Sequence, residues 1–150
     1  MTKPIARRPA FGRKMTTMRI DQPALDYCAG NFKSVSGGAG WLAEWAANAL
    51  ARALPLALSR LDQPERLALI DMHSGHMLNP QMAGPAHLAL MVLDSAPEGL
   101  PQERGYDTEA LAAKCEAMTT AESAAVAVWA CGYWRAGHHE KMSMEEYANG

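Results

Sequence analysis

WLAEWAANALARAL, residues 41–54, is the stretch that decides the fold. Glu44, Asn48 and Arg52 recur at every fourth position, so on a helix they share one narrow polar stripe. Nearly every other residue of the stretch is apolar, and a helix with so little polar surface belongs inside a protein. The pattern therefore predicts a central, mostly buried helix.

Glycine and proline flank this helix. Residues 36–40 read SGGAG, which predicts a flexible hinge ahead of the helix. This segment lacks both the lysine of a phosphate-binding loop and a preceding strand, so a linker is the favoured interpretation. Pro55 is expected to end or kink the helix, because proline lacks an amide hydrogen and clashes with the preceding turn. Residues 56–61 are then expected to continue at an angle.

Two further helices are predicted by the residues that start and fill them. Asp62 precedes Pro64 by two residues, which suits a cap with proline in the first turn, and we expect this helix to cover residues 64–78. Residues 86–95 form an apolar run whose length alone fits a buried helix or a buried strand. Alanine, leucine and methionine dominate the run, and they favour helix.

Capping signals predict three helices in the C-terminal third. In a capping box, a hydroxyl and a carboxylate three residues later satisfy free backbone amides at a helix start. The middle helix is expected to run through Arg135 and to end at Gly137, because glycine adopts the left-handed conformation that terminates helices. The predicted starts are Asp107 or Thr108, the box Thr119 with Glu122, and the box Ser143 with Glu146.

The chain as a whole predicts an all-α fold, since it has no internal repeat and no alternating strand pattern. With 150 residues, 49% of them hydrophobic, it is long enough for one domain with a buried core. We expect an irregular compact bundle of about five or six helices, forming a single domain over residues 23–150. An extended, flexible basic arm over residues 1–22 is expected to precede it, because Pro4, Pro9 and Gly12 break helical periodicity there.

Charge is segregated between that arm and the rest of the chain. The first twenty residues hold six cations and no acid, whereas the remaining 130 residues hold eight cations and sixteen acids. Flexible basic arms contact phosphates and can enter the minor groove of DNA, so the arm is a candidate nucleic-acid contact. The net-acidic body opposes such binding by long-range repulsion, and a solvated tail is the alternative. The six cations are Lys3, Arg7, Arg8, Arg13, Lys14 and Arg19.

Three histidines form a candidate metal site. His73 and His76 are three residues apart, so on a continuous helix both could face one metal, and His87 is the candidate third ligand. The H-E-x-x-H pattern and a paired-cysteine pattern are both absent. Histidines at this spacing are more often partly buried hydrogen-bonding residues, so no cofactor is expected.

Trp134 and Arg135 are a candidate protein interface. Tryptophan and arginine side chains dominate the binding energy of protein interfaces, and these adjacent residues have that composition. Trp134 is turned by about 100° from the helix face that carries Trp129 and Tyr133. Such a group of rings normally belongs to the core, so the interface depends on whether Trp134 and Arg135 are exposed.

Cysteine usage and segment composition favour a cytoplasmic location. Cys28, Cys115 and Cys131 are odd in number and widely separated, without a C-x-x-C pair, so reduced thiols are expected. No apolar segment follows the basic N-terminus as it would in a signal peptide, and no run is long enough to span a bilayer. We therefore expect no membrane contact.

The sequence shows no catalytic motif that we recognise. The cysteines have no obvious adjacent base and no G-x-S-x-G elbow occurs, so an enzyme is the less favoured hypothesis. The sequence favours a non-enzymatic binding or regulatory accessory protein with a protein partner, with nucleic acid as a second contact through the arm, and it leaves homo-oligomerisation open. One alternative is a metal-dependent enzyme or metal-stabilised domain using the three histidines. The other is a protein inhibitor with an acidic, nucleic-acid-mimicking surface, whose candidate acids are Glu98, Glu103, Asp107 and Glu109.

Overall fold

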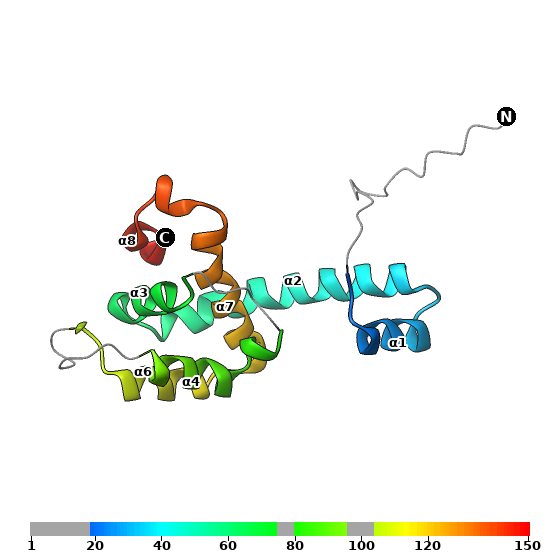
Figure 1. Cartoon of the computed structure of the whole chain (residues 1–150), viewed down its shortest axis with the longest axis horizontal. Coiled ribbons are helices and arrows are strands. Elements are labelled where there is room, and N and C mark those ends of the chain that lie inside the picture. The colour runs from blue at the N-terminus through cyan, green and yellow to red at the C-terminus, as the bar shows by residue number, and fades with distance from the viewer. Residues whose placement is uncertain (1–18, 75–79, 96–103) are drawn as a thin grey trace. The chain divides into compact units, whose positions relative to one another are not determined.

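The computed structural model describes residues 19–74, 80–95 and 104–150, and within these ranges every regular element is a helix (Figure 1). The expected all-α class is confirmed, with seven α-helices in the described ranges. None of them combines the length and apolar character that crossing a membrane requires. The elements are α1 (Gln22–Asn31), α2 (Val35–Ser59), α3 (Gln63–Met72), the 3-10 helix η2 (Pro80–Ala83), α4 (Pro85–Asp94), α6 (Thr108–Glu116), α7 (Thr120–Arg135), the 3-10 helix η3 (His138–Glu140) and α8 (Met144–Asn149).

The chain divides into two compact units. The first ends at Ala43 and the second runs from Glu44 to Gly150, so the division falls within α2. Residues 1–18 of the expected basic arm lie outside the described residues, and the boundary expected at residue 22 stays a prediction.

The first unit contains α1 and the beginning of α2. Ser34 caps α2, because its side-chain oxygen accepts a hydrogen bond of 3.0 Å from the Gly37 amide. The Phe32 ring packs on the Trp41 ring, with 5.8 Å between ring centroids, and it also covers Gly38. A Cβ at Gly38 would lie 2.6 Å from the Phe32 ring, so this position requires glycine. The hinge expected over residues 36–40 is therefore wrong, since these residues form the first turns of α2.

The second unit is built on a core to which α2, α3, α4, α6 and α7 contribute. A second buried cluster joins α3, α7 and α8 through Ile70, Tyr133 and Ala148. Arg66 of α3 connects α2 with α8, because its guanidinium donates hydrogen bonds to the backbone carbonyls of Leu58 and Ala148. The largest fully buried aliphatic side chains are Leu69, Ile70, Leu88, Leu111, Val92 and Val126.

Local capping signals are confirmed along the second unit. The spacing of Thr119 with Glu122 and of Ser143 with Glu146 gives complete capping boxes at the starts of α7 and α8. Asp107 caps α6, and the run predicted over residues 86–95 is helical as α4, which ends at Asp94 with Ser95 as its C-cap. Gly137 follows α7 with a φ of 65°, in the left-handed conformation expected of a helix stop.

Two expected helix ends differ. Pro55 does not end the helix, and α2 continues to Ser59. The carbonyl that loses its hydrogen bond to Pro55 belongs to Ala51, which is exposed, so water can satisfy it. The helix expected over residues 64–78 ends at Met72, where both the amide and the Nδ1 atom of His73 approach the Leu69 carbonyl, at 3.2 and 2.7 Å.

Candidate functional site

The most apolar long helix of the described chain is largely uncovered. Between Glu44 and Ser59, only Ala53 and Ala57 of α2 are buried. Trp45 is 61% exposed and Leu56 is 60% exposed. The expectation of a mostly buried helix is therefore wrong, because the core contacts α2 along one edge near its C-terminal end. A helix that is apolar on nearly all sides is normally buried by the rest of the protein or by a partner. The exposed surface of α2 is therefore the first candidate for a binding site.

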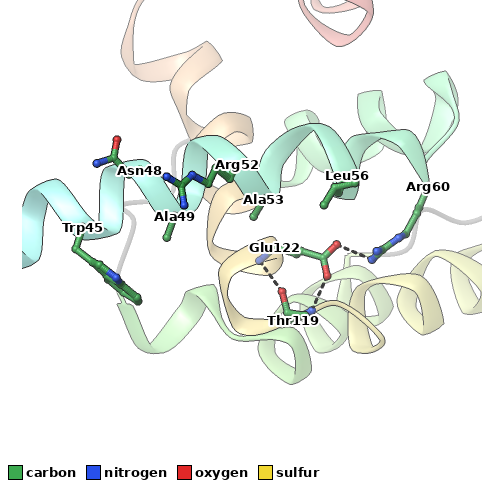
Figure 2. Close-up of a pocket in the computed structure, with 9 residues that line it drawn as sticks. All are labelled: Trp45, Asn48, Ala49, Arg52, Ala53, Leu56, Arg60, Thr119 and Glu122. Carbon is green, nitrogen blue, oxygen red and sulfur yellow. Dashed lines mark hydrogen bonds and ion pairs between the residues drawn. The ribbon is translucent and has the colours of Figure 1, made fainter.

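A groove runs along this surface, between α2 and the start of α7 (Figure 2). Its volume is about 640 Å³, within the range of ligand sites, and it is open to solvent. We call it the α2 groove. It is lined by Trp45, Asn48, Ala49, Arg52, Ala53, Leu56, Arg60, Thr119 and Glu122.

One wall of the α2 groove is fixed by Glu122. Its Oε2 atom pairs with the Arg60 guanidinium at 2.5 Å, and its Oε1 atom accepts a hydrogen bond of 3.1 Å from the Thr119 amide. The Glu122 side chain is only 7% exposed, whereas that of Arg60 is 54% exposed. The carboxylate thus ties the end of α2 to the first turn of α7 and also completes the cap of α7 (Figure 2).

The same contacts determine the electrostatics of the α2 groove. Glu122 pairs with Arg60, whereas within the part of the chain that the structure describes no acid forms an ion pair with Arg52, the other cation of the groove. The capping box of α7 engages two of the amides at its N-terminus, those of Thr119 and Glu122. The groove therefore offers an aromatic ring, aliphatic side chains and one guanidinium, which is a combination typical of protein interfaces.

Trp134 and Arg135, the candidate interface pair, differ in exposure, since Trp134 is partly buried and Arg135 is exposed. The Trp134 indole nitrogen donates a hydrogen bond of 2.8 Å to the Ile70 carbonyl, and its ring meets Tyr133 edge-on at 5.0 Å. Trp134 thus holds α7 against α3. Arg135 is exposed beside a smaller hollow of about 390 Å³, near Trp129 and Tyr147. The interface assigned to Trp134 and Arg135 stays a prediction.

The candidate metal ligands are not assembled by the described residues. His73 is buried and follows the end of α3, with Nδ1 2.7 Å from the Leu69 carbonyl oxygen. His87 lies on α4 and is partly buried. His76 lies outside the described residues. Among those that are described, no three His, Cys, Asp or Glu side chains are placed to hold a metal ion.

The remaining sequence candidates fall partly outside the described chain. Of the six arm cations, Arg19 is described and exposed, whereas the other five lie within residues 1–18. Of the four acids proposed for a mimicking surface, Asp107 and Glu109 are exposed at the start of α6. Glu98 and Glu103 lie outside the described residues.

The three cysteines are free and buried. Burial and, to a smaller extent, the nearby Glu65 carboxylate together raise the pKa of Cys115 to about 12. Burial also raises the pKa of Cys131, an effect that Arg135 partly offsets. Both thiols are therefore protonated at neutral pH, and neither is an activated nucleophile.

Sequence reasoning missed the α2 groove. Its two walls come from residues 62 positions apart, Arg60 and Glu122, and no local pattern announces that contact. The available signal was the apolar character of the helix around Trp45, which predicts burial without saying by what. Comparison with protein-family models, with curated proteins and with solved structures finds no match to this chain.

Proposed function

We propose that this protein acts by binding a macromolecular partner through the α2 groove, as an accessory protein without catalysis of its own. The supporting observation is that Trp45 and Leu56 present their side chains to solvent on an apolar helix. Exposing such side chains has a free-energy cost of roughly 25 cal/mol per Å² of apolar surface. A partner that covers them recovers this free energy.

The shape of the α2 groove favours a protein over a small molecule. Sites for small molecules enclose most of the ligand surface, whereas this groove lies open along a helix. Trp45 and Leu56 are eleven residues apart, which corresponds to about 16 Å along the helix axis. A contact of that length suits the side of another helix or a strand, whose side chains would engage both anchors.

Charge segregation supports a second contact, with nucleic acid. Six cations and no acid lie in the first twenty residues, and Arg19 at the edge of this segment is exposed. Each phosphate neutralised by such a cation releases condensed counterions, which gives binding that weakens steeply with salt. The arm and the α2 groove would then serve one accessory protein with two macromolecular contacts.

The proposal is tested by site-specific photo-cross-linking in the full chain. A photoreactive amino acid is placed at position 45, at position 56, or at the exposed control position 116 on α6. We expect one discrete adduct from positions 45 and 56 and none from position 116, because only the first two line the α2 groove. Absence of adducts, or equal adducts from all three positions, would contradict the proposal.

A further inference from the structure

We propose that the partner bound in the α2 groove is an amphipathic helix of another protein, which carries a carboxylate beside its apolar side chains to pair with Arg52. The inference rests on the proposed function, because it names the chemistry of the partner of the same surface. It follows from the elements that form the groove and from the order of the lining residues along α2.

The walls of the α2 groove determine which kind of segment fits it. Both walls are helical, since the lining residues come from α2 and from the start of α7. A strand laid in the groove would meet no sheet edge, so its own amides and carbonyls would lose water without gaining a partner. A helix satisfies its backbone groups internally before it binds. The groove therefore favours a helix over an extended peptide.

Three lining residues of α2 form a row in the order apolar, cationic, apolar. Arg52 is seven residues beyond Trp45, and Leu56 is four residues further on, so the three lie within about 40° of one another around the helix. Arg52 thus lies between two exposed apolar anchors, about 10 Å from Trp45 and about 6 Å from Leu56 along the axis. A partner that covers both anchors must pass over the guanidinium.

Arg52 determines the charge that the partner needs. It is exposed, and no acid of the described ranges forms an ion pair with it, whereas Arg60 is already paired with the buried Glu122. Covering a guanidinium without giving it a partner costs free energy, and a second cation placed over it adds repulsion. A carboxylate instead accepts up to two hydrogen bonds from it. We therefore expect glutamate or aspartate opposite Arg52, and not lysine or arginine.

Small side chains between the anchors leave room for large side chains of the partner. Ala49 and Ala53 lie nearer than Trp45 to the buried side of α2, and Ala53 is itself buried. Figure 2 shows both alanines on the edge of α2 that faces Thr119 and Glu122. The partner helix therefore needs large apolar side chains, such as leucine or methionine, in the middle of its apolar face.

Selection from a displayed peptide library tests the inference on the full chain. The library holds helical peptides of about 18 residues, which spans both anchors with one turn beyond each. Leucines are fixed along one face, and the positions that flank them are randomised. We expect the native chain to enrich glutamate and aspartate at the flanking positions, and Arg52→Glu to enrich lysine and arginine instead. Arg135→Glu, an exposed reversal on α7, is the matched control and should select the same peptides as the native chain.

The affinity of one selected acidic peptide then tests the individual contacts. In fluorescence anisotropy, Leu56→Ala and Arg52→Glu should each weaken binding about tenfold, because the first removes apolar contact area and the second reverses the charge. Leu90→Ala on α4 removes a similarly exposed leucine that does not line the groove, so it should have no effect. Circular dichroism on each variant verifies that the substitutions leave the helices intact.

The possible results separate the two proposals. The inference is overturned if the native chain enriches no peptide, if it enriches lysine and arginine, or if Arg52→Glu selects the same peptides as the native chain. If position 45 then still cross-links to a macromolecule, the proposed function stands and only the acidic helix fails. An adduct of position 45 with a second copy of the chain or with nucleic acid likewise overturns the inference alone. If neither peptides nor adducts are obtained, both proposals fail.

Discussion

Arg60 and Glu122 form an ion pair 2.5 Å long that joins the end of α2 to the first turn of α7. The two partners contribute unequally, because Arg60 is half exposed while Glu122 is buried and also caps α7. Water screens the Arg60 side of the pair, so the ion pair by itself is worth little. Most of the stabilisation provided by Glu122 therefore comes from the capping box.

Substitutions at these two residues should separate the contribution of the capping box to stability from that of the ion pair. Glu122→Ala removes both and should lower the free energy of unfolding by about 1–2 kcal/mol. Arg60→Ala removes only the ion pair and should have an effect below about 1 kcal/mol. Glu122→Gln keeps an acceptor for the Thr119 amide, so it should resemble Arg60→Ala. Urea denaturation measures all three, and equal losses for Glu122→Gln and Glu122→Ala would show that the cap is unimportant.

Two glycines of α2 should respond oppositely to the same substitution. Gly38→Ala places a Cβ 2.6 Å from the Phe32 ring and should destabilise the first unit by about 1–3 kcal/mol. Gly40→Ala meets no atom within 4 Å and lies inside the helix, so it should stabilise by about 0.5–1 kcal/mol. Hydrogen exchange of the first turns of α2 reports both effects. If both variants increase protection alike, Phe32 does not pack on Gly38.

Alkaline pH should destabilise the second unit through Cys115. The pKa of its thiol rises from 9.0 to about 12 on folding, so folding favours the protonated form. That contribution is complete below pH 9 and is lost as pH rises towards 12, at up to about 1.4 kcal/mol per pH unit. Burial also raises the pKa of Tyr147, which acts in the same direction.

Comparison with Cys115→Ala isolates the cysteine contribution. The variant should unfold more readily at neutral pH, because it loses buried sulfur, yet lose less further stability above pH 9. Denaturant titrations at successive pH values measure the difference. If the free energy of unfolding of the native chain and of the variant fell in parallel above pH 9, ionisation of Cys115 would not contribute to the loss of stability.

The sequence predicted local structure better than tertiary structure. The capping box of Thr119 and Glu122 spans four residues, so its geometry is complete within one turn and needs no knowledge of the rest of the chain. Residues 36–40 were misassigned for the opposite reason. Their glycines resemble a hinge until the Phe32 ring, which lies outside the segment, gives Gly38 a packing role. Glycine content alone does not distinguish flexibility from close approach.

The candidate site shows the same limit. The stripe of Glu44, Asn48 and Arg52 was visible in the sequence, but the apolar remainder of α2 led to the expectation of a mostly buried helix, which is wrong. Periodicity carries no information on whether the cover belongs to the same chain. The structure leaves Trp45 exposed, and this difference between expected and observed burial is why we propose the α2 groove as a binding surface.

The basic arm should add a salt-dependent affinity for nucleic acid. Fluorescence anisotropy with labelled duplex DNA, single-stranded DNA and RNA compares the full chain with a chain that starts at Asp21. If all six cations contact phosphates of a duplex, the logarithm of the binding constant falls with the logarithm of salt concentration with a slope of about −5. The shortened chain should lose this binding, while Arg135→Glu in the full chain, at an exposed position on α7, should retain it.

The outcome of that titration shows which cations of the chain, if any, contact nucleic acid. Binding that survives removal of the arm but is lost in Arg135→Glu would place the contact on α7 and contradict a role for the arm. Absence of binding at low salt would contradict nucleic-acid recognition altogether, since electrostatic attraction is strongest there. The arm would then be a solvated tail, or would pair with acidic groups of the same chain.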